Sequence, residues 1–324
     1  MRVRIVIAPD KLAGTYTAAE AAVALARGWL GVRPDDEAVT VPLADGGEGT
    51  AEALLAARGG EWRWCTVRDA LGRPRRARFA LLPAGEAVLD VAEACGRQTV
   101  SDLPPDPLAA SSFGAGQLIA AAAGAGASRI IVGVGGTAST DGGEGLRRAL
   151  AGAAEGVELV AALDVRNPLL GPDGAAAVFG PQKGASPEQV AALEGRLAAL
   201  HLPTAGIPGA GAGGGIGGML MALGARATSG AELVADAAGL DGLLAGAALC
   251  LTAEGRIDRS TLAGKVVATV ADKCAAAGVK CIAVGGIVDS EAARELERRG
   301  CETYERGDME LAGAELAARH SSRS

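Results

Sequence analysis

The hydrophobic pattern near both ends of the chain alternates between short apolar runs and longer amphipathic stretches. The run RVRIVIA (2–8) predicts a buried strand, and TAAEAAVALARGWL (17–30) predicts a helix that a threonine can cap. The same alternation predicts strands at 38–44, 248–254 and 279–286, and helices at 49–59, within 260–278 and at 289–300. Strands separated by helical segments indicate a parallel sheet covered by helices on both faces.

The middle of the chain has a different pattern. Two strand-like runs, 61–82 and 86–94, follow one another, and the first contains a turn-prone LGRP. This pattern favours an antiparallel or mixed sheet. A helix near 107–123, strands at 129–136 and 156–165, and a glycine-dense stretch at 206–218 follow. We therefore expect an α/β fold. A parallel-sheet, Rossmann/flavodoxin-like domain (residues 1–65 and 230–324) holds a second α/β domain (66–229) inserted in it.

Composition narrows the classes of function. The 324 residues are 49% hydrophobic, which is enough for two cores, and only 2% aromatic. With a net charge of −7 and no long basic run, nucleic acid is not an expected partner. Nine glycines within the uncharged stretch 205–225 argue against a spanning helix, and the first residues look like a strand rather than a signal peptide. We expect a cytoplasmic protein without membrane association.

Cysteine and histidine usage limits the chemistry further. The six cysteines form no C-x-x-C pair and are interpreted as reduced thiols. The two histidines, His201 and His320, are too few for a multi-histidine zinc site and are poorly placed for a histidine-based triad. An enzyme of this composition must work with carboxylates, lysine, arginine and backbone amides.

Two loops that follow predicted strands carry polar residues suited to a site. In APDKLAGTYT (8–17), Asp10 and Lys11 precede a helix start whose amides can bind an anion. In PLADGGEGT (42–50), Asp45 can bind a hydroxyl or a metal, and Gly46 and Gly47 allow close approach of a ligand, with the next glutamate in the first helical turn. An ordinary capped loop is the alternative in both places.

The pentapeptide DGGEG of 45–49 recurs at 141–145, inside GVGGTASTDGGEG (133–145). Backbone amides and hydroxyls here can cradle phosphate, and Asp141 can hold Mg²⁺. The cradle candidates are Gly135, Gly136, Thr137 and Thr140. No Walker A loop occurs in the sequence, and a permissive surface loop is the alternative.

Three later segments add candidates. TAEGRIDRSTLAGK (252–265) gathers charges after a predicted strand, namely Glu254, Arg256, Asp258 and Lys265, although a salt-bridged loop would look similar. In the segment 162–186, Asp164 could accept a hydroxyl proton, and Lys183 lies in a glycine-flanked turn. PGAGAGGGIGG (208–218) fits G-x-G-x-x-G without a preceding strand, so linker, close packing and nucleotide contact all stay open. A dehydrogenase is disfavoured because GVGGTA lacks an acid at the required spacing.

Taken together, these segments resemble the glycerate kinase family of the bacterial glycerate 2-kinase type. The matching stretches, in order over residues 3–287, are APDKLAGT, PLADGGEGT, DALGRP, GGTASTDGGEG, DVRNPLLG, FGPQKGAS, PGAGAGGG and TAEGRIDRSTLAGK. The resemblance implies ATP-dependent phosphorylation of D-glycerate with Mg²⁺, at the 2- or 3-hydroxyl depending on the member. It also implies a two-domain α/β protein with its active site between the domains.

We expect 2-phosphoglycerate as the product, with roles distributed as follows. Thr137, Thr140 and Asp141 would bind phosphate and Mg²⁺, while Asp45 and Asp164 are candidates for the general base, and Asp45 also for the metal. The cations expected to bind the glycerate carboxylate or phosphate oxygens are Arg256, Lys183 and Lys11. The other candidates for substrate or phosphate binding are Asp10, Gly46, Gly47, Gly135, Gly136, Glu254, Asp258 and Lys265.

The sequence departs from the family pattern at three places. Ala13 stands where a lysine is usual, Ala253 stands where a glycine is usual, and the stretch between Gly145 and Asp164 is short. These departures keep an alternative open: a catalytically weakened paralogue that binds or regulates, or a kinase for another small hydroxy acid. A homodimer is a candidate oligomeric state.

Overall fold

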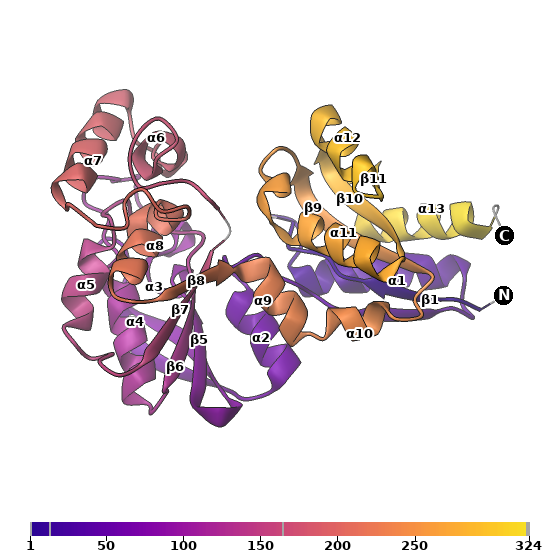
Figure 1. The fold of residues 1–324 in the computed structure, drawn as a ribbon, viewed down its shortest axis with the longest axis horizontal. Coiled ribbons are helices and arrows are strands. Elements are labelled where there is room, and N and C mark those ends of the chain that lie inside the picture. Colours follow the sequence, from indigo (N-terminus) through magenta and orange to yellow (C-terminus); the bar gives the residue numbers. More distant parts are fainter. Residues whose placement is uncertain (1, 13, 164, 322–324) are drawn as a thin grey trace. The chain divides into compact units, whose positions relative to one another are not determined.

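The computed structural model describes residues 2–12, 14–163 and 165–321 (Figure 1). It contains two compact units: unit 1 comprises Met1–Asp45 and Ala231–Ser324, and unit 2 comprises Gly46–Gly230. The expected α/β fold, with one part of the chain inserted into the other, is confirmed. The first break comes earlier than the expected boundary at residue 65, because the helix and strand that follow Asp45 pack against the sheet of unit 2.

Unit 1 is built on a five-stranded parallel sheet with the order β11-β10-β9-β1-β2. Its strands are β1 Arg4–Ile7, β2 Glu37–Thr40, β9 Leu249–Ile257, β10 Lys280–Val288 and β11 Cys301–Glu305. Its helices are α1 Ala18–Val32, α9 Gly230–Ala237, α10 Leu240–Leu244, α11 Val266–Ala277, α12 Ser290–Arg298 and α13 Met309–Ser321, with the short 3₁₀ turn η4 at Thr261–Ala263. α9 starts on the last residue of unit 2.

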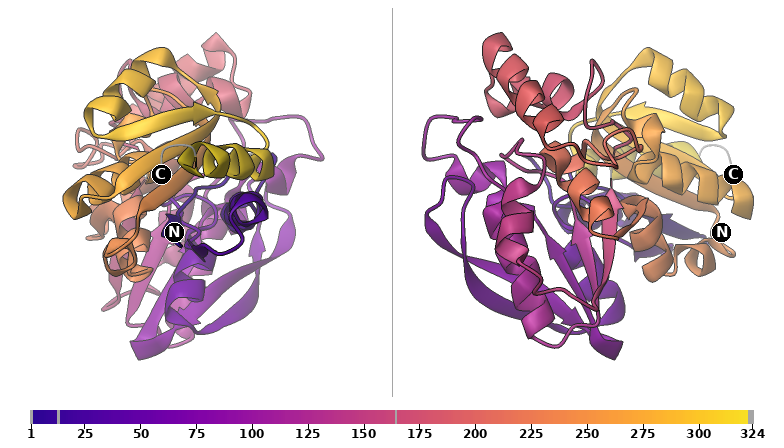
Figure 2. Two further views of the ribbon diagram at one scale, coloured as in Figure 1. Left: turned by 90° about the vertical axis from the view of Figure 1, so that its right-hand side faces the viewer. Right: turned by 60° about the vertical axis from the view of Figure 1, so that its left-hand side comes forward.

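Helices cover both faces of the sheet in unit 1, which can be followed in the views of Figure 2. On one face, Leu25 and Trp29 of α1 and Leu316 of α13 pack on Ile7 and Leu251 of the strands. α11 packs against β9 and β10, and α12 against β11. Thr17 begins α1 with a capping box, as the sequence predicts.

Unit 2 contains a six-stranded mixed sheet with the order β3-β4-β5-β6-β7-β8. The pairs β3–β4 and β4–β5 are antiparallel and the others are parallel, so the expected mixed sheet is confirmed. The strands are β3 Glu61–Arg68, β4 Pro74–Leu82, β5 Glu86–Asp90, β6 Arg129–Gly133, β7 Glu158–Leu163 and β8 Arg226–Ser229.

The helices of unit 2 pack on this sheet and around a smaller core beside it. They are α2 Thr50–Arg58, α3 Ala92–Cys95, α4 Phe113–Gly124, α5 Glu144–Leu150, α6 Ala175–Phe179, α7 Pro187–Ala199 and α8 Ala212–Ala222, with the 3₁₀ turns η1 Pro83–Gly85, η2 Arg97–Val100 and η3 Pro181–Lys183. The main core joins α4, α5 and α8 to the strands, and α6 and α7 share the smaller one. Because β5, β6 and β7 are parallel, the loops that follow them leave the same edge of the sheet.

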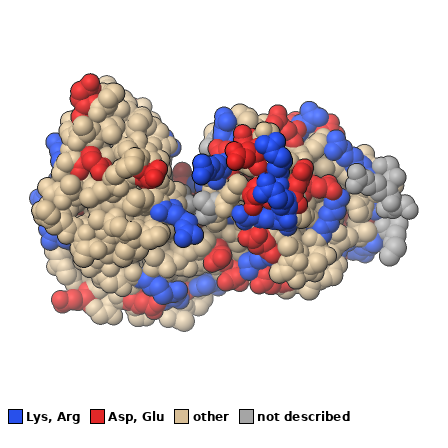
Figure 3. Space-filling view, turned by 45° about the horizontal axis from the view of Figure 1, so that its top comes forward, with Lys and Arg blue, Asp and Glu red and all other residues tan. Residues whose placement is uncertain are grey.

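Charged side chains of both signs are mixed on the surface of unit 1, whereas unit 2 is largely uncharged on the face seen in Figure 3. Ion pairs such as those of Lys273 with Asp236 and Asp241 account for part of this mixing. Within the described ranges, no helix combines the length and the apolar character needed to cross a membrane.

Candidate active site

Unit 1 gathers three buried carboxylates near the carboxyl ends of neighbouring strands, which we call the carboxylate cluster. Asp10 follows β1, Asp45 follows β2, and Glu254 lies in β9; their exposed fractions are 4%, 7% and 9%. β9, β1 and β2 are adjacent in the sheet, and the Asp10 amide donates to the Ala253 carbonyl at 2.8 Å. The ends of neighbouring parallel strands thus bring these three acids together within unit 1.

The electrostatics of the carboxylate cluster favour a bound proton. Burial, together with the charges of Asp45 and Glu254, raises the pKa of Asp10 well above its ordinary value. The Lys11 amide donates to Asp10 Oδ1 at 2.7 Å and opposes this rise, as does the charge of Lys11. Burial beside like charges therefore favours the neutral form of Asp10.

Glu254 is held by two partners from the next loop. Thr261 Oγ1 donates to it at 2.8 Å, and Lys265 Nζ lies 3.5 Å from its other oxygen. Burial still raises the pKa of Glu254, against the pull of these partners. Asp258 is different: burial opposes ionisation there, but the amide and hydroxyl of Ser260 donate to Oδ1 and lower its pKa.

Unit 2 contains the glycine loop, residues 134–145, which leaves β6 and leads into α5. Lys183, from η3, reaches this loop: its Nζ donates to Thr137 Oγ1 at 3.1 Å and to the Ser139 carbonyl at 2.5 Å. Burial lowers the pKa of Lys183 to about 8 because the charged form loses hydration. The structure therefore brings Lys183 and Thr137 together, with an ammonium that titrates just above neutrality.

The glycine loop also holds a hydroxyl with unmet hydrogen-bonding capacity. Thr140 is 1% exposed, and its Oγ1 has no hydrogen-bond partner in the part of the chain that the structure describes. Gly136, with φ +73°, adopts a conformation that L side chains rarely take. Its carbonyl accepts from the Arg97 amide at 3.1 Å, and Ala138 N donates to the Cys95 carbonyl at 2.8 Å. Cys95, just before η2, and Arg97, its first residue, thus hydrogen-bond to the loop through their backbones.

Asp141 is the most heavily hydrogen-bonded of the predicted residues. Its Oδ2 accepts from the amide and hydroxyl of Ser112 at 2.8 and 2.9 Å, and from Ser111 Oγ and Gly145 N at 3.2 Å. Its Oδ1 accepts from Gly143 N at 3.2 Å. A carboxylate has about four lone-pair positions, so this geometry favours a structural role that ties α5 to the start of α4.

The first DGGEG loop, residues 45–49, is organised by a residue that sequence reasoning missed. Asp90, the last residue of β5, accepts from Gly49 N at 2.9 Å and from Ala51 N at 3.1 Å, so it caps α2 from another strand. Gly49 itself offers no side-chain cap. An acid ending the apolar run EAVLD was the available signal, but its partner lies 41 residues away.

Two glycines let this loop sit close to the sheet of unit 2. A Cβ on Gly46, which has φ +100°, would lie 2.9 Å from the Ala162 backbone. A Cβ on Gly133 would lie 2.7 Å from Asp90 Oδ1 and 3.0 Å from the Gly46 carbonyl. The glycines are therefore required for packing. The expected position of Glu48 in the first turn of the helix is wrong, since α2 begins at Thr50 and Glu48 precedes it.

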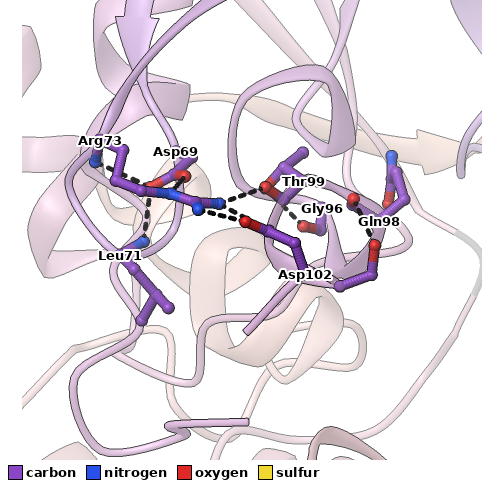
Figure 4. Close-up of polar contacts among 8 residues, drawn as sticks. Asp69, Leu71, Arg73, Gly96, Gln98, Thr99 and Asp102 are labelled. Carbon is purple, nitrogen blue, oxygen red and sulfur yellow. Dashed lines mark hydrogen bonds and ion pairs between the residues drawn. The ribbon is translucent and has the colours of Figure 1, made fainter. Parts of the chain in front are cut away.

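A second missed contributor is the DALGRP turn (Figure 4). Arg73 donates to Asp69 at 2.6 Å, to both oxygens of Asp102 at 2.6 and 2.9 Å, and to the Thr99 carbonyl at 3.0 Å. Thr99 Oγ1 in turn donates to the Gly96 carbonyl at 2.8 Å. Gly96 forms an isolated bridge with Thr137 of the glycine loop. Arg73 thus stabilises η2 through its hydrogen bond to Thr99, and Gly96, the residue before η2, contacts the glycine loop.

The glycine-dense stretch 208–218 packs closely and does not act as a linker. Gly213, Gly214 and Gly215 all have positive φ at the start of α8 and interrupt its regular geometry. A Cβ on Gly214 would lie 2.1 Å from the Ser139 carbonyl, and one on Gly211 would lie 2.3 Å from the Pro168 carbonyl. Close packing, one of the expected alternatives, is confirmed, and nucleotide contact stays a prediction.

Comparison with known proteins places this geometry in a family. A model of the glycerate kinase family matches residues 5–155 and 150–312. The chain belongs to the glycerate kinase family. It is 39% identical over 313 residues to the glycerate 2-kinase of Escherichia coli K12, covering 83% of this chain and 82% of that protein. It is 45% identical to an uncharacterised protein of Mycobacterium bovis, covering 88% and 79%.

A solved structure agrees with this membership. The crystal structure of a Salmonella typhimurium LT2 protein assigned as glycerate kinase 2 aligns with a TM-score of 0.78 and 32% identity, covering 100% of this chain and 99% of that one. The chain is therefore an enzyme of the kinase class with the two-part α/β architecture of its relatives.

In this glycerate kinase the predicted residues fall into two described groups. Asp10, Lys11, Asp45, Glu254, Arg256, Asp258 and Lys265 belong to unit 1, and Gly46, Gly47, Gly135, Gly136, Thr137, Thr140, Asp141 and Lys183 belong to unit 2. Arg256 is exposed, unlike the carboxylate cluster. Asp164, a candidate base, and Ala13 lie outside the described residues. The catalytic roles of all these residues stay predictions.

Proposed function

We propose that this glycerate kinase transfers the terminal phosphoryl group of ATP to D-glycerate, with the 2-hydroxyl as acceptor and Mg²⁺ as the metal. The observation that carries the proposal is the carboxylate cluster of Asp10, Asp45 and Glu254, buried near the strand ends in a chain of this family. The name of the Escherichia coli relative, a glycerate 2-kinase, supports the 2-hydroxyl.

The cluster supplies the proton acceptor that the reaction needs. A hydroxyl that attacks phosphorus must lose its proton, and a positioned carboxylate oxygen within hydrogen-bonding reach can take it. We assign this acceptance to Asp45, the cluster member that begins the DGGEG loop. Burial and the neighbouring acids raise the pKa of Asp10, which favours its neutral form and so lowers the negative charge in the cluster.

The donor set fits Mg²⁺ held partly by the substrate. No group of three or more Asp, Glu, His or Cys residues within the described ranges forms a metal site by itself. Mg²⁺ commonly takes only one or two protein carboxylates and completes its shell with water and phosphate oxygens. Asp45 with Glu254 would hold it, whereas Asp141 already accepts five hydrogen bonds, four of them at Oδ2, which disfavours that residue. When bound, Mg²⁺ neutralises charge on the phosphate oxygens.

The glycine loop supplies groups for phosphate. The Lys183 ammonium donates two hydrogen bonds within the protein and can donate a third, while the unpartnered Thr140 hydroxyl offers another polar contact. Lys11 and Arg256 in unit 1 are cations for the glycerate carboxylate, and Arg256 is already exposed to solvent.

The test is incubation of the full chain with Mg-ATP and D-glycerate, with NMR identification of the product. We expect 2-phosphoglycerate and one ADP for each product molecule. The matched control is Asp45→Asn, which replaces the proposed base by an amide of the same size. Absence of ADP above the substrate-free background would refute the kinase proposal, and 3-phosphoglycerate as the product would refute the assignment of the 2-hydroxyl.

A further inference from the structure

Four of the six cysteines gather on one face of the sheet in unit 1. Cys250 of β9, Cys281 of β10 and Cys301 of β11 are aligned in register across three adjacent parallel strands. Side chains in register on parallel strands point to the same face, and here this face is covered by α11, which carries Cys274. The remaining two cysteines, at 65 and 95, lie in unit 2.

The sulfur atoms of this cysteine cluster are in contact. Cys301 Sγ lies 3.3 Å from Cys281 Sγ, and the thiols of Cys250 and Cys281 hydrogen-bond to Cys274 and lower its pKa. All four residues are at most 1% exposed, and all are free thiols. Neighbouring strands lie about 4.8 Å apart, inside the window of roughly 4.4–6.8 Å between the Cα atoms of disulfide-bonded cysteines.

The position of Cys301 makes the pair reachable by a small oxidant. β11 is an edge strand of the sheet, and Cys301 is its first residue, directly after Gly300 with φ +81° at the end of α12. An edge strand is paired on one side only and opens locally at lower cost than a central strand. Opening at the start of β11 exposes Cys301 and then Cys281 beside it.

We propose that Cys281 and Cys301 form an oxidisable dithiol that closes into an intrachain disulfide between β10 and β11. The oxidant is hydrogen peroxide. One sulfur attacks a peroxide oxygen, the O–O bond breaks, and a sulfenic acid and one water form after proton transfer. The second thiol then attacks that sulfur, the S–O bond breaks and a second water leaves. Two thiols are oxidised, one peroxide is reduced, and an external dithiol reverses the reaction.

The dithiol is separate from the residues proposed for phosphoryl transfer. Cys250, in the same row as the pair, precedes Glu254 by four positions in β9, a distance of about 13 Å along a strand. Glu254 shares the α11 face of the sheet with Cys250, so the two groups are separated by distance along the strand and not by face. Oxidation of the pair and kinase activity can therefore be measured independently.

The experiment oxidises the folded full chain with hydrogen peroxide, blocks remaining thiols with N-ethylmaleimide in denaturant, and maps tryptic peptides. Each cysteine of the cluster falls on its own peptide: 227–256, 274–280, 281–294 and 300–306. We expect a linked species of 281–294 with 300–306 that disappears after dithiothreitol, and four blocked thiols per chain instead of six.

Matched variants make the result decisive. Cys301→Ser should keep all five remaining thiols free under the same dose, whereas Cys65→Ser should form the 281–301 link as the parent chain does. The proposal is overturned if the folded chain keeps six free thiols, if the link forms only after denaturation, or if a different pair is joined. Circular dichroism of both variants before oxidation confirms that folding is retained.

Discussion

The two DGGEG loops have identical sequences and different structures, and the difference places their aspartates in unlike surroundings. Asp45 lies in a buried group of carboxylates with Asp10 and Glu254. Asp141 accepts five hydrogen bonds from residues of its own loop and from the start of α4. One aspartate lies beside other buried acids, and the other lies among hydrogen-bond donors.

The helices after the two loops begin at different points of the pentapeptide. α5 begins at Glu144, inside the pentapeptide. Asp141 accepts from the amides of Gly143, just before this helix, and of Gly145 within it. α2 begins at Thr50, after the pentapeptide, and takes its cap from Asp90 of β5. The first amides of a helix have no partner within the helix, so an acceptor from outside it stabilises the helix start. Where a neighbouring strand supplies that acceptor, the aspartate of the loop does not have to cap the helix.

Exchanging Asp45 for asparagine should have the largest effect on activity. Loss of the proposed base is expected to lower kcat by about 10²–10⁴-fold, with the melting temperature equal or higher because one of three mutually repelling acids is gone. Steady-state ADP release and thermal unfolding measure the two quantities. Near-normal turnover would show that the two aspartates do not differ in the way proposed.

Replacing Asp141 by alanine should give the opposite result, a loss of stability. Five donors lose their acceptor, several of them buried, and the expected cost is about 3 kcal/mol of the free energy of unfolding. Urea unfolding of Asp141→Ala, compared with the parent chain and with Asp45→Asn, measures this cost. If Asp141→Ala unfolds like the parent chain yet loses turnover at low temperature, its role is chemical and the contrast between the loops fails.

The pH dependence of kcat/KM tests the role proposed for Lys183, which contacts the glycine loop that contains the second DGGEG. A lysine loses its charge as pH rises, and the pKa of Lys183 is lowered to about 8 by burial. If the ammonium binds phosphate, kcat/KM should fall roughly tenfold per pH unit above about pH 8. Lys183→Arg keeps its charge at these pH values, so the decline should vanish in it. An identical decline in both forms would assign the titration to another group.

The smallest effect is expected at the cap of α2. Asp90→Ala removes the acceptor for Gly49 and Ala51 and should destabilise unit 2 by about 1–2 kcal/mol. Asp90→Asn keeps one acceptor oxygen and should lose about half as much. Chemical denaturation followed by circular dichroism compares the two. Equal stability of Asp90→Ala and the parent would mean that α2 does not depend on this cap.

Much of the fold follows from local pattern, and much of the candidate site does not. The strand and helix alternation in unit 1, the mixed sheet of unit 2 and the cap at Thr17 agree with expectation because periodicity and capping are local properties. Asp90, Arg73 and the cysteine row were missed because each meets partners on other elements, which local sequence pattern does not reveal. The position of Glu48 was missed because two glycines delay the helix.

The interrupted course of the chain also sets an order of events during synthesis. Unit 2 is one continuous stretch, Gly46–Gly230, and all six strands of its sheet are available once that stretch is made. β1 and β2, made first, must wait for β9 to complete their sheet. Proteins emerge from the ribosome amino end first and fold as units. The carboxylate cluster, which needs Glu254, therefore assembles only after the whole of unit 2 has been made.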